Sequence, residues 1–369
     1  MSNSSANARD AVSSSMYDAY RFPWKWYLTD LDKLQKNGCK VFSCFSCGGG
    51  SSMGYKLAGF DVIGNVEIDP KVMDVYKQNN HPKYPYLMDV RDFLNIPDAD
   101  LPAELFQLDI LDGSPPCSVF STAGNREKDW NKEKVFREGQ EKQKLDDLFF
   151  YFIHIAKKLQ PKIVVAENVA GLIKGNARGY VNEIFKAFNQ AGYTTQLFFL
   201  NAAFMGVPQR RERCFFVARR KDLNFSKLTM EFQEKPILFG DIRQEHGDDS
   251  RDTEYKDRIR KYFKPTDHTI EDINRRIRKT GGFTNPITRD NEVSPTITAS
   301  GQMFRAYDKM HYHSLDFIST TTFPQDYDCG QEEPQYICGM SVPPVMMAHV
   351  AAEIYSQWLR GDKNGKTEN

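Results

Sequence analysis

A single cysteine after a stiff turn is the strongest chemical signal in the sequence. Cys117 ends the segment Asp112-Gly-Ser-Pro-Pro-Cys, and the apolar run from Phe106 to Leu111 before it predicts a buried strand. Gly113 and the two prolines stop that strand, and the prolines fix φ and remove two backbone donors. Such a turn could present the thiol as a nucleophile at the carboxyl end of a strand. The alternative is a buried structural cysteine, and this segment alone does not separate the two.

A carboxylate and two guanidinium groups could assist that nucleophile. The apolar run 162–169 predicts another buried strand, and Glu167 lies near its end. Burial there disfavours the charged form of the carboxyl group, which suits proton donation. Arg211 and Arg213 alternate just before a strand predicted over 214–218, so both side chains would face the same side. A surface ion-pair cluster is the alternative interpretation of the two arginines.

A glycine-rich turn and two acidic residues predict a nucleoside site. The predicted strand 41–45 is followed by the turn 47–52, and the next two predicted strands end near Glu67 and Asp89. Glycines let the backbone approach a ligand closely, and an acid at the next strand end suits ribose hydroxyls. The string G-x-G-x-x-G is incomplete, so the pattern favours a nucleoside over a dinucleotide. A tight turn without a ligand is the alternative.

The elements that would position these residues alternate between strand and helix. The spacing of apolar residues predicts helices over 145–159 and 180–190, and a strand is predicted over 194–201. This alternation indicates an α/β fold with a doubly wound, Rossmann-like sheet. It stops near Asp222, and residues 223–288 are polar and predicted to be irregular. Between Arg251 and Lys279 ten basic residues face six acidic ones, which makes this segment a candidate phosphate-facing region or a solvated surface.

Composition limits the class of protein. The 369 residues carry 49 basic and 49 acidic side chains, so a nucleic-acid partner would have to be held by local clusters. The seven cysteines show no disulfide framework, which favours a reducing, cytosolic compartment. No apolar run approaches the length of a membrane span, so we expect a soluble protein without a membrane partner.

Four further patterns have weaker functional interpretations. Cys44 and Cys47 match C-x-x-C, but the pair lies inside a strand-to-glycine turn, which disfavours a redox or zinc site. His311 and His313 have no third ligand at a suitable spacing, so we expect surface histidines and no metal. The charged segment 121–144 follows the nucleophile and favours a functional lid over a solvated face. The aromatic patch 20–27 is expected to pack against the protein, with partner binding as the alternative.

Taken together, the segments resemble the DNA cytosine carbon-5 methyltransferases of bacteria and phages over roughly residues 40–351. The order of the blocks matches as well as their content. The matching segments are Phe45-Ser-Cys-Gly-Gly-Gly, Glu67-Ile-Asp, Asp89-Val, Gly113-Ser-Pro-Pro-Cys, Glu167-Asn-Val, Gln209-Arg-Arg-Glu-Arg, Arg289 through Pro295-Thr-Ile-Thr-Ala, Phe323-Pro-Gln-Asp-Tyr and Gly339-Met-Ser-Val-Pro-Pro.

The resemblance implies a reaction and a set of site residues. Cys117 would add to carbon-6 of a flipped-out cytosine, Glu167 would assist at ring nitrogen-3, and Arg213 with Arg211 would hold the carbonyl oxygen of the base. Carbon-5 would then accept the methyl group of S-adenosylmethionine, and no metal would take part. The implied cofactor contacts are Phe45, Gly48, Gly50, Glu67, Ile68, Asp89, Val90, Pro116, Leu148 and Ser341. The implied DNA contacts are Ser121, Gly124, Gln209, Thr296 and Thr298.

The resemblance also implies the domain organisation. It gives a smaller, irregular target-recognition domain and a methyltransferase domain whose last part returns near the carboxyl end. The expected ranges are an N-terminal extension 1–39, a catalytic domain 40–222 completed by 336–360, a target-recognition domain 223–335 and a polar tail 361–369. Three positions depart from the family pattern in the expected cofactor pocket. Ser43 replaces the usual aspartate, Cys47 a glycine and Met340 an asparagine.

Three functions remain in competition at this stage. The favoured one is methylation of double-stranded DNA by a monomer in a bacterial or phage-infected cytoplasm, with a cognate restriction endonuclease as an expected partner. A transfer RNA cytosine methyltransferase and a catalytically silent DNA-binding protein are the alternatives. The long segment before Arg289 favours a DNA-reading lobe, and retention of Cys117, Glu167 and Arg213 disfavours a silent protein.

Overall fold

A computed structural model describes most of the chain. The described residues are 20–116, 147–173, 178–248, 250, 254–279 and 285–361. Cys117, Ser121, Gly124, the predicted lid 121–144 and most of the polar tail lie outside this part of the chain.

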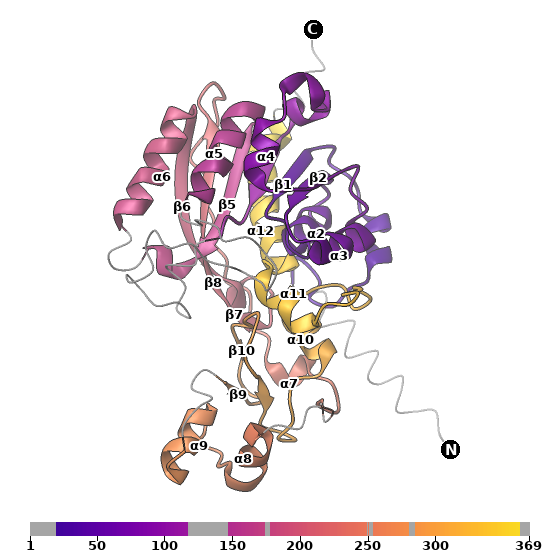
Figure 1. The fold of residues 1–369 in the computed structure, drawn as a ribbon, viewed down its shortest axis with the longest axis vertical. Coiled ribbons are helices and arrows are strands. Elements are labelled where there is room, and N and C mark those ends of the chain that lie inside the picture. Colours follow the sequence, from indigo (N-terminus) through magenta and orange to yellow (C-terminus); the bar gives the residue numbers. More distant parts are fainter. Residues whose placement is uncertain are drawn as a thin grey trace.

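A seven-stranded sheet forms the centre of the larger lobe (Figure 1). Its strand order is β3-β2-β1-β4-β5-β8-β6, with β8 antiparallel to both of its neighbours and the other pairs parallel. The strands are β1 (Lys40–Cys44), β2 (Asp61–Glu67), β3 (Tyr84–Leu87), β4 (Ile110–Gly113), β5 (Ile163–Val169), β6 (Tyr193–Asn201) and β8 (Glu212–Arg220). The expected α/β sheet is confirmed. The order of the strands reverses between β1 and β4, and open sheets of this type bind ligands at the carboxyl ends of the strands at such a point.

Helices cover both faces of the sheet, which confirms the doubly wound architecture. One face packs against α4 (Val90–Asn95), α5 (Leu148–Leu159) and α6 (Arg178–Gln190), and the other against α2 (Gly50–Leu57) and α12 (Pro344–Ile354). The first six residues of β5, Ile163 to Asn168, are all buried, as expected for a strand covered on both faces. Helix α3 (Pro70–Asn80) lies between β2 and β3 in the chain. Asp69 caps its N-terminus, because its carboxylate accepts hydrogen bonds from the amides of Lys71 and Val72, and Pro70 occupies the first helical position.

The strand before the predicted nucleophile is shorter than its apolar sequence indicated. Residues 103–107 form a 3-10 helix, and β4 begins only at Ile110. The prediction of a strand starting at Phe106 was therefore wrong. Pro102 precedes the 3-10 turn, and Leu105, not Phe106, is the residue that this turn buries completely. A short apolar run does not distinguish a buried turn from a strand.

The C-terminal segment returns to the large lobe. The segment Pro334–Leu359, which includes α11 (Pro334–Met340) and α12, is long and apolar enough to meet a length-and-composition test for a membrane span, contrary to our expectation. However, 78% of its apolar window is buried inside the protein, so its packing against α2 and the sheet accounts for the apolar composition. The aromatic patch 20–27 packs on the same core through Trp24 and Trp26, which confirms the packing interpretation.

A smaller lobe lies below the sheet in Figure 1 and has a core of its own. That core contains Ile259, Ile270, Ile273, Ile287 and Phe304. Contrary to the irregular structure expected over 223–288, the described part of that segment includes three helices, α7 (Phe239–Ile242), α8 (Glu254–Tyr262) and α9 (Ile270–Ile277). Helices α8 and α9 contribute to the core of the smaller lobe, whereas α7 packs on the large core. Helix α8 buries Lys256 and Arg258, so its inward face lacks the apolar period that would have predicted it.

A short strand pairing joins the smaller lobe to the larger one. Strand β10 (Ser294–Pro295) pairs with β7 (Gln209–Arg210) at this junction. Strand β11 (Phe304–Arg305) pairs with β9 (Ile287–Thr288) within the smaller lobe. Helix α10 (Ser314–Thr320) and parts of 228–242 belong to the large core. The separate core of the smaller lobe thus draws its residues from only part of the range 223–335.

Candidate active site

The carboxyl ends of four adjacent strands bring the predicted site together. Strand order places the ends of β2, β1, β4 and β5 side by side. These ends carry Glu67, the turn 45–50, the segment 112–116 and Glu167, respectively. Residues from four distant parts of the sequence therefore meet at one edge of the sheet, where open α/β sheets form their sites.

Glu167 and Arg213 form an ion pair at this edge. The Nε atom of Arg213 lies 2.8 Å from Oε1 of Glu167, and their side chains are only 13% and 9% exposed. The pair is built by the antiparallel β5–β8 ladder, in which Val169 is the partner of Arg213 and Glu167 lies two residues earlier on the same face. A carboxyl and a guanidinium group held side by side in a largely water-excluded place can contact adjacent polar atoms on the edge of one planar ligand.

Asn168 connects this pair to the turn that leads to Cys117. Its Nδ2 atom donates to the carbonyl oxygen of Pro115 at 3.0 Å, and its Oδ1 atom accepts the amide of Val169 at 2.9 Å. Asn168 is 3% exposed, so both bonds are shielded from water. The turn before Cys117 is thereby fixed to the end of β5, a role that sequence analysis did not assign to Asn168. Cys117 itself lies outside the described residues.

Arg211 does not share the position of Arg213. Its two terminal nitrogens donate to the carbonyl oxygens of Ile297 and Gly339, both at 3.1 Å, and the residue is 2% exposed. Burial, together with the charge of Arg213, lowers the pKa of Arg211 to about 9. Arg211 therefore joins three distant segments, and its role at a bound base stays a prediction that this geometry does not favour.

Gln209 is likewise buried where a DNA contact was predicted. Its side chain is fully buried, donating to the carbonyl oxygen of Thr320 at 3.4 Å and accepting the amide of Ile297 at 3.2 Å. Thr296 and Thr298 are more accessible, with hydroxyls donating to the carbonyl oxygens of Arg210 at 2.6 Å and Ser300 at 2.5 Å. Gln209 thus holds the junction of the lobes, and the two threonines remain candidate DNA contacts.

The glycine turn after β1 is held by several polar groups. The backbone has positive φ at Phe45 (54°), Cys47 (46°) and Gly49 (79°). Oε2 of Glu67 accepts the amide of Cys47 at 2.8 Å, and Tyr327 donates its hydroxyl to the carbonyl oxygen of Gly48. Two residues other than glycine in the left-handed region store strain, which persists only where the surroundings enforce it.

The residues at this turn fit S-adenosylmethionine. Ile68 follows the end of β2, and Leu87 is the last residue of β3 and the partner of Glu67 in the β2–β3 pair. They remain 40% and 47% exposed, so they offer an apolar surface beside Glu67 to a flat ring. Ser341, 4% exposed, has a buried hydroxyl oxygen without a hydrogen-bond partner, as a missing polar ligand would leave it. The carboxylates of Glu67 and Asp69 near the turn suit a positively charged cofactor.

The other predicted cofactor residues have mixed positions. Asp89 caps α4 and accepts the amide of Arg91 at 2.8 Å, and Phe45 and Pro116 are half-buried at the strand ends. Val90 and Leu148 are buried in the core at 5% and 3% exposure, so direct contact of either residue with a cofactor stays a prediction. Gly48 and Gly50 pack closely on Ile337 and on the carbonyl oxygen of Val342, so their small size is needed for chain packing as well.

The alternative metal and redox sites are not supported in the described part of the chain. It contains no cluster of three or more candidate metal ligands. Burial raises the pKa of Cys44 well above its ordinary value and that of Cys47 to about 12, so neither is a reactive thiolate. His311 is 4% exposed and packs on Phe304 with ring centroids 4.3 Å apart, so the prediction of a surface histidine was wrong there. The bridge between His311 and Phe304, which buries the histidine, could not be predicted from the spacing of His311 and His313 in the sequence.

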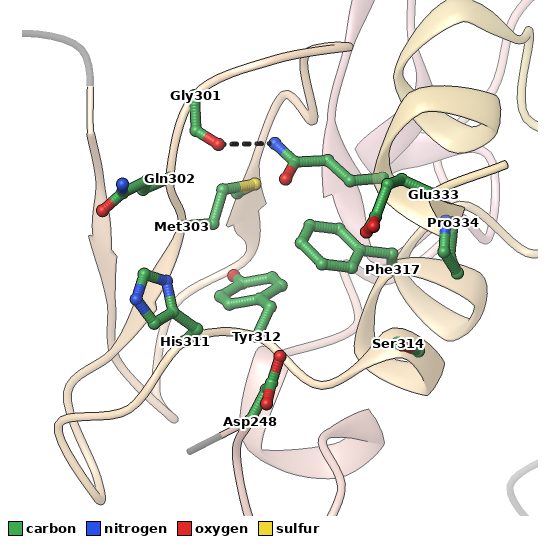
Figure 2. Close-up of a pocket in the computed structure, with 11 residues that line it drawn as sticks. Asp248, Gly301, Gln302, Met303, His311, Tyr312, Ser314, Phe317, Glu333 and Pro334 are labelled. Atoms are coloured by element: carbon green, nitrogen blue, oxygen red, sulfur yellow. Dashed lines mark hydrogen bonds between the residues drawn. The ribbon is translucent and has the colours of Figure 1, made fainter. Parts of the chain in front are cut away.

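A separate hollow lies between the smaller lobe and α10–α11 (Figure 2). Figure 2 shows Met303, Tyr312 and Phe317 gathered within it, and the side chain of Gln335 donates to the carbonyl oxygen of Gly301 at 3.1 Å across it. None of the predicted site residues lines this hollow. Glu167 and Arg213 lie instead at the sheet edge.

Comparison with known proteins identifies the family of the chain. The sequence profile described as C-5 cytosine-specific DNA methylase matches residues 39–356. The chain belongs to the C-5 cytosine-specific DNA methylase family. It is 35% identical over 193 residues to the type II methyltransferase M.FnuDI of Fusobacterium nucleatum, covering 52% of this chain and 50% of the relative. It is 35% identical over 191 residues to the type II methyltransferase M.NgoPII of Neisseria gonorrhoeae, covering 51% and 50%. The matched region thus spans about half the length of these C-5 methylase relatives.

A solved structure of the same fold supports the architecture. A crystallised protein encoded within an Escherichia coli prophage, described as a candidate DNA modification methyltransferase, superposes with a TM-score of 0.62. The superposition covers 87% of this chain and 99% of that protein at 19% sequence identity. At this identity the likeness establishes the fold, which is the Rossmann-like methyltransferase sheet expected from the sequence.

Proposed function

We propose that this methylase-family protein transfers a methyl group to carbon-5 of a flipped-out cytosine in a specific double-stranded DNA sequence. The observation that carries the proposal is the buried Glu167–Arg213 pair at 2.8 Å, beside a proline turn that leads directly to Cys117. A nucleophile, an acid and a cationic group for the carbonyl oxygen are the three functions that attack on a cytosine ring requires.

Each residue has a distinct role in the proposed reaction. The Cys117 thiolate adds to carbon-6, while Glu167 donates a hydrogen bond or proton to nitrogen-3 and Arg213 binds the carbonyl oxygen at carbon-2. The addition makes carbon-5 nucleophilic, and bound S-adenosylmethionine supplies the methyl group to it. Loss of the carbon-5 proton and departure of the sulfur restore the aromatic ring. Stacked bases are inaccessible to these groups, so the cytosine must leave the duplex.

The surfaces beside the sheet edge suit a nucleic acid. In the described part of α8, α9 and the segment around them, exposed basic side chains include Lys261, Lys264, Arg275, Arg278 and Lys279. A basic surface on the smaller lobe compensates for the zero net charge of the whole chain by attracting phosphates locally. We assign DNA reading to this lobe and closure over the base to the segment 121–144.

Partner and location follow from the same proposal. The enzyme is proposed to act as a monomer in the cytoplasm of a bacterial or phage-infected cell. A cognate restriction endonuclease is the partner that the type II systems of its relatives suggest. Light scattering of the purified chain, alone and with duplex DNA, measures the stoichiometry.

Methyl transfer from isotopically labelled S-adenosylmethionine tests the function. Duplex DNA and transfer RNA are incubated separately with the protein, digested to nucleosides and analysed by mass spectrometry. The proposal predicts labelled 5-methylcytosine in DNA with the wild type and none with Cys117→Ser. Label confined to transfer RNA would show an RNA enzyme instead. Tight DNA binding without any transfer would show a silent binding protein.

A further inference from the structure

Asp112 is a buried carboxyl group beneath the glycine turn, and the proposed chemistry does not use it. It lies in β4 and is 1% exposed. Ser43 of β1 donates its hydroxyl to Oδ2 of Asp112 at 2.9 Å, and Tyr55 of α2 donates its hydroxyl to Oδ1 at 3.3 Å. A carboxyl group removed from water needs such partners, and here they come from the two elements on either side of one turn.

The turn between those two elements is the strained one. Ser43 is two residues before Phe45, the first residue with positive φ, and Tyr55 lies in the helix that the turn opens. Asn65 supports the turn from β2 by donating to Oγ of Ser46 at 2.8 Å, and Glu67 supports it through the amide of Cys47. Asp112 differs from both because it holds the strand before the turn and the helix after it at the same time.

The register of the sheet explains why the carboxyl group can do this. Ser43 and Asp112 are direct partners in the parallel β1–β4 pair. Paired residues on adjacent strands project to the same face, so a carboxyl group on either strand would occupy nearly the same place. In this chain the residue on β1 is a serine, and its partner on β4 carries the acid.

We propose that Asp112 is a positioning residue for the cofactor, a buried carboxyl group that sets the geometry of the turn 45–50. This inference rests on the proposed function, because it takes that turn as the binding site of S-adenosylmethionine. Asp112 acts through Ser43 and Tyr55 and does not itself contact the cofactor or the reacting base. Ser51, in the first turn of α2, adds a third hydroxyl that favours the charged carboxylate of Asp112.

Reciprocal exchange of the two residues tests this proposal. The full-length wild type and the variants Asp112→Ser, Asp112→Asn and Ser43→Asp/Asp112→Ser are titrated with S-adenosylhomocysteine by calorimetry. Loss of the two hydrogen bonds in Asp112→Ser is expected to weaken binding by about tenfold or more. The double variant returns the carboxyl group to the same face and is expected to recover binding to within about threefold of the wild type.

Two further measurements separate positioning from general stability. Affinity for duplex DNA, measured by fluorescence anisotropy, should be unchanged in all variants. In Asp112→Asn the KM for S-adenosylmethionine should rise while kcat at saturation stays near the wild-type value. If Asp112→Ser does not fold, the isosteric Asp112→Asn, checked by circular dichroism, gives the binding result.

The outcomes that overturn the inference are distinct from those that overturn the function. Wild-type binding of S-adenosylhomocysteine combined with unimpaired binding in both single variants would overturn the role of Asp112 alone. If the double variant binds S-adenosylhomocysteine no more tightly than Asp112→Ser does, a carboxyl group at position 43 does not replace the one at position 112. Failure of the wild type to bind would overturn the proposed function, and this inference with it.

Discussion

The Nε atom of Arg213 lies 2.8 Å from Oε1 of Glu167, near one end of the antiparallel β5–β8 pair in the central sheet. Two charged groups at this distance in a low-dielectric place determine each other's orientation. A base entering between the Pro115–Pro116 turn and this pair would meet a carboxyl and a guanidinium group that are already aligned. The arrangement costs little reorganisation during the reaction, which is how preorganised sites stabilise transition states.

Neutralising the acid should therefore reduce the chemical step. Glu167→Gln keeps the shape of the side chain but removes proton donation, and kcat is expected to fall by about 100-fold to 10,000-fold. Single-turnover methyl transfer at saturating substrates measures the step directly. Glu183→Gln is the matched control, because Glu183 forms an exposed pair with Lys186 far from the sheet edge. Equal rates in the two variants would contradict the role of Glu167.

The two arginines should separate into different classes of defect. Arg211→Ala leaves the carbonyl oxygens of Ile297 and Gly339 without donors and should lower the free energy of unfolding by at least about 2 kcal/mol. Arg213→Ala should instead lower kcat with a smaller loss of stability. Urea denaturation and single-turnover rates on both variants measure the two effects. Equal stabilities combined with equal rate defects would show that both arginines serve the base.

Close packing between α2 and α12 should depend on Gly54. A Cβ atom at this position would lie 2.4 Å from the carbonyl oxygen of Pro344, so Gly54→Ala forces the two helices apart. Overpacking of this kind costs about 1–3 kcal/mol. Gly179→Ala, in the exposed first turn of α6, is the control because nothing lies within 4 Å of its added methyl group. Thermal unfolding of both variants provides the comparison, and equal melting temperatures would contradict the close contact.

Strain at Cys47 predicts a substitution that does not destabilise. Cys47 has φ of 46°, a region that glycine adopts without a steric penalty, so Cys47→Gly should leave stability equal or raise it by up to about 1 kcal/mol. Gly49→Ala, with φ of 79° and a Cβ that would lie 2.3 Å from Nδ2 of Asn80, should destabilise the protein. Denaturant unfolding of both variants tests this contrast. A large loss of stability in Cys47→Gly would mean that its thiol contributes more than its backbone strain costs.

Asp112 should make stability depend on pH. Burial, reinforced by the charge of Glu167, raises its pKa from 3.8 to about 7, against the effect of the hydroxyls of Ser43, Ser51 and Tyr55. Between about pH 4 and pH 7 the folded protein keeps a proton that the unfolded chain releases, so the free energy of unfolding falls as pH rises, at most by about 1.4 kcal/mol per pH unit.

The variant Asp112→Asn removes that titration. Its free energy of unfolding should fall less steeply than that of the wild type across the same pH window, because the amide has no proton to release there. Urea denaturation curves of both proteins, collected from about pH 4.5 to pH 7.5, measure the difference. Parallel pH profiles would show that Asp112 titrates alike in the folded and unfolded states.

The sequence was informative where local pattern and tertiary environment agree. Buried apolar runs predicted the strands that carry Glu67 and Glu167, and the order of the motif blocks predicted the fold and the family. It failed at Phe106, because an apolar run does not reveal a 3-10 turn, and on α8, because Lys256 and Arg258 point inward. The apolar period of a helix cannot reveal that a charged side chain is buried, as Arg258 is against Asn274 of α9.

Side-chain roles set by long-range contacts were also beyond the sequence. Nothing local distinguishes Arg211 from Arg213, since their difference arises from carbonyl oxygens 86 and 128 residues away. The bond from Asn168 to Pro115 and the pairing of Ser43 with Asp112 depend on sheet order and register in the same way. These contacts require the three-dimensional arrangement, which is why Asp112 and Asn168 were recognised only in the structure.

Covalent trapping tests the central claim most directly. The wild type and Cys117→Ser are incubated with S-adenosylmethionine and duplex DNA that carries 5-fluorocytosine in place of cytosine, because fluorine at carbon-5 prevents release of the sulfur after methyl transfer. Because Cys117 is proposed to bond to carbon-6, we expect a denaturant-resistant protein–DNA adduct with the wild type and none with Cys117→Ser. An adduct formed equally by both proteins, or by neither on DNA while fluorinated transfer RNA is trapped, would contradict it.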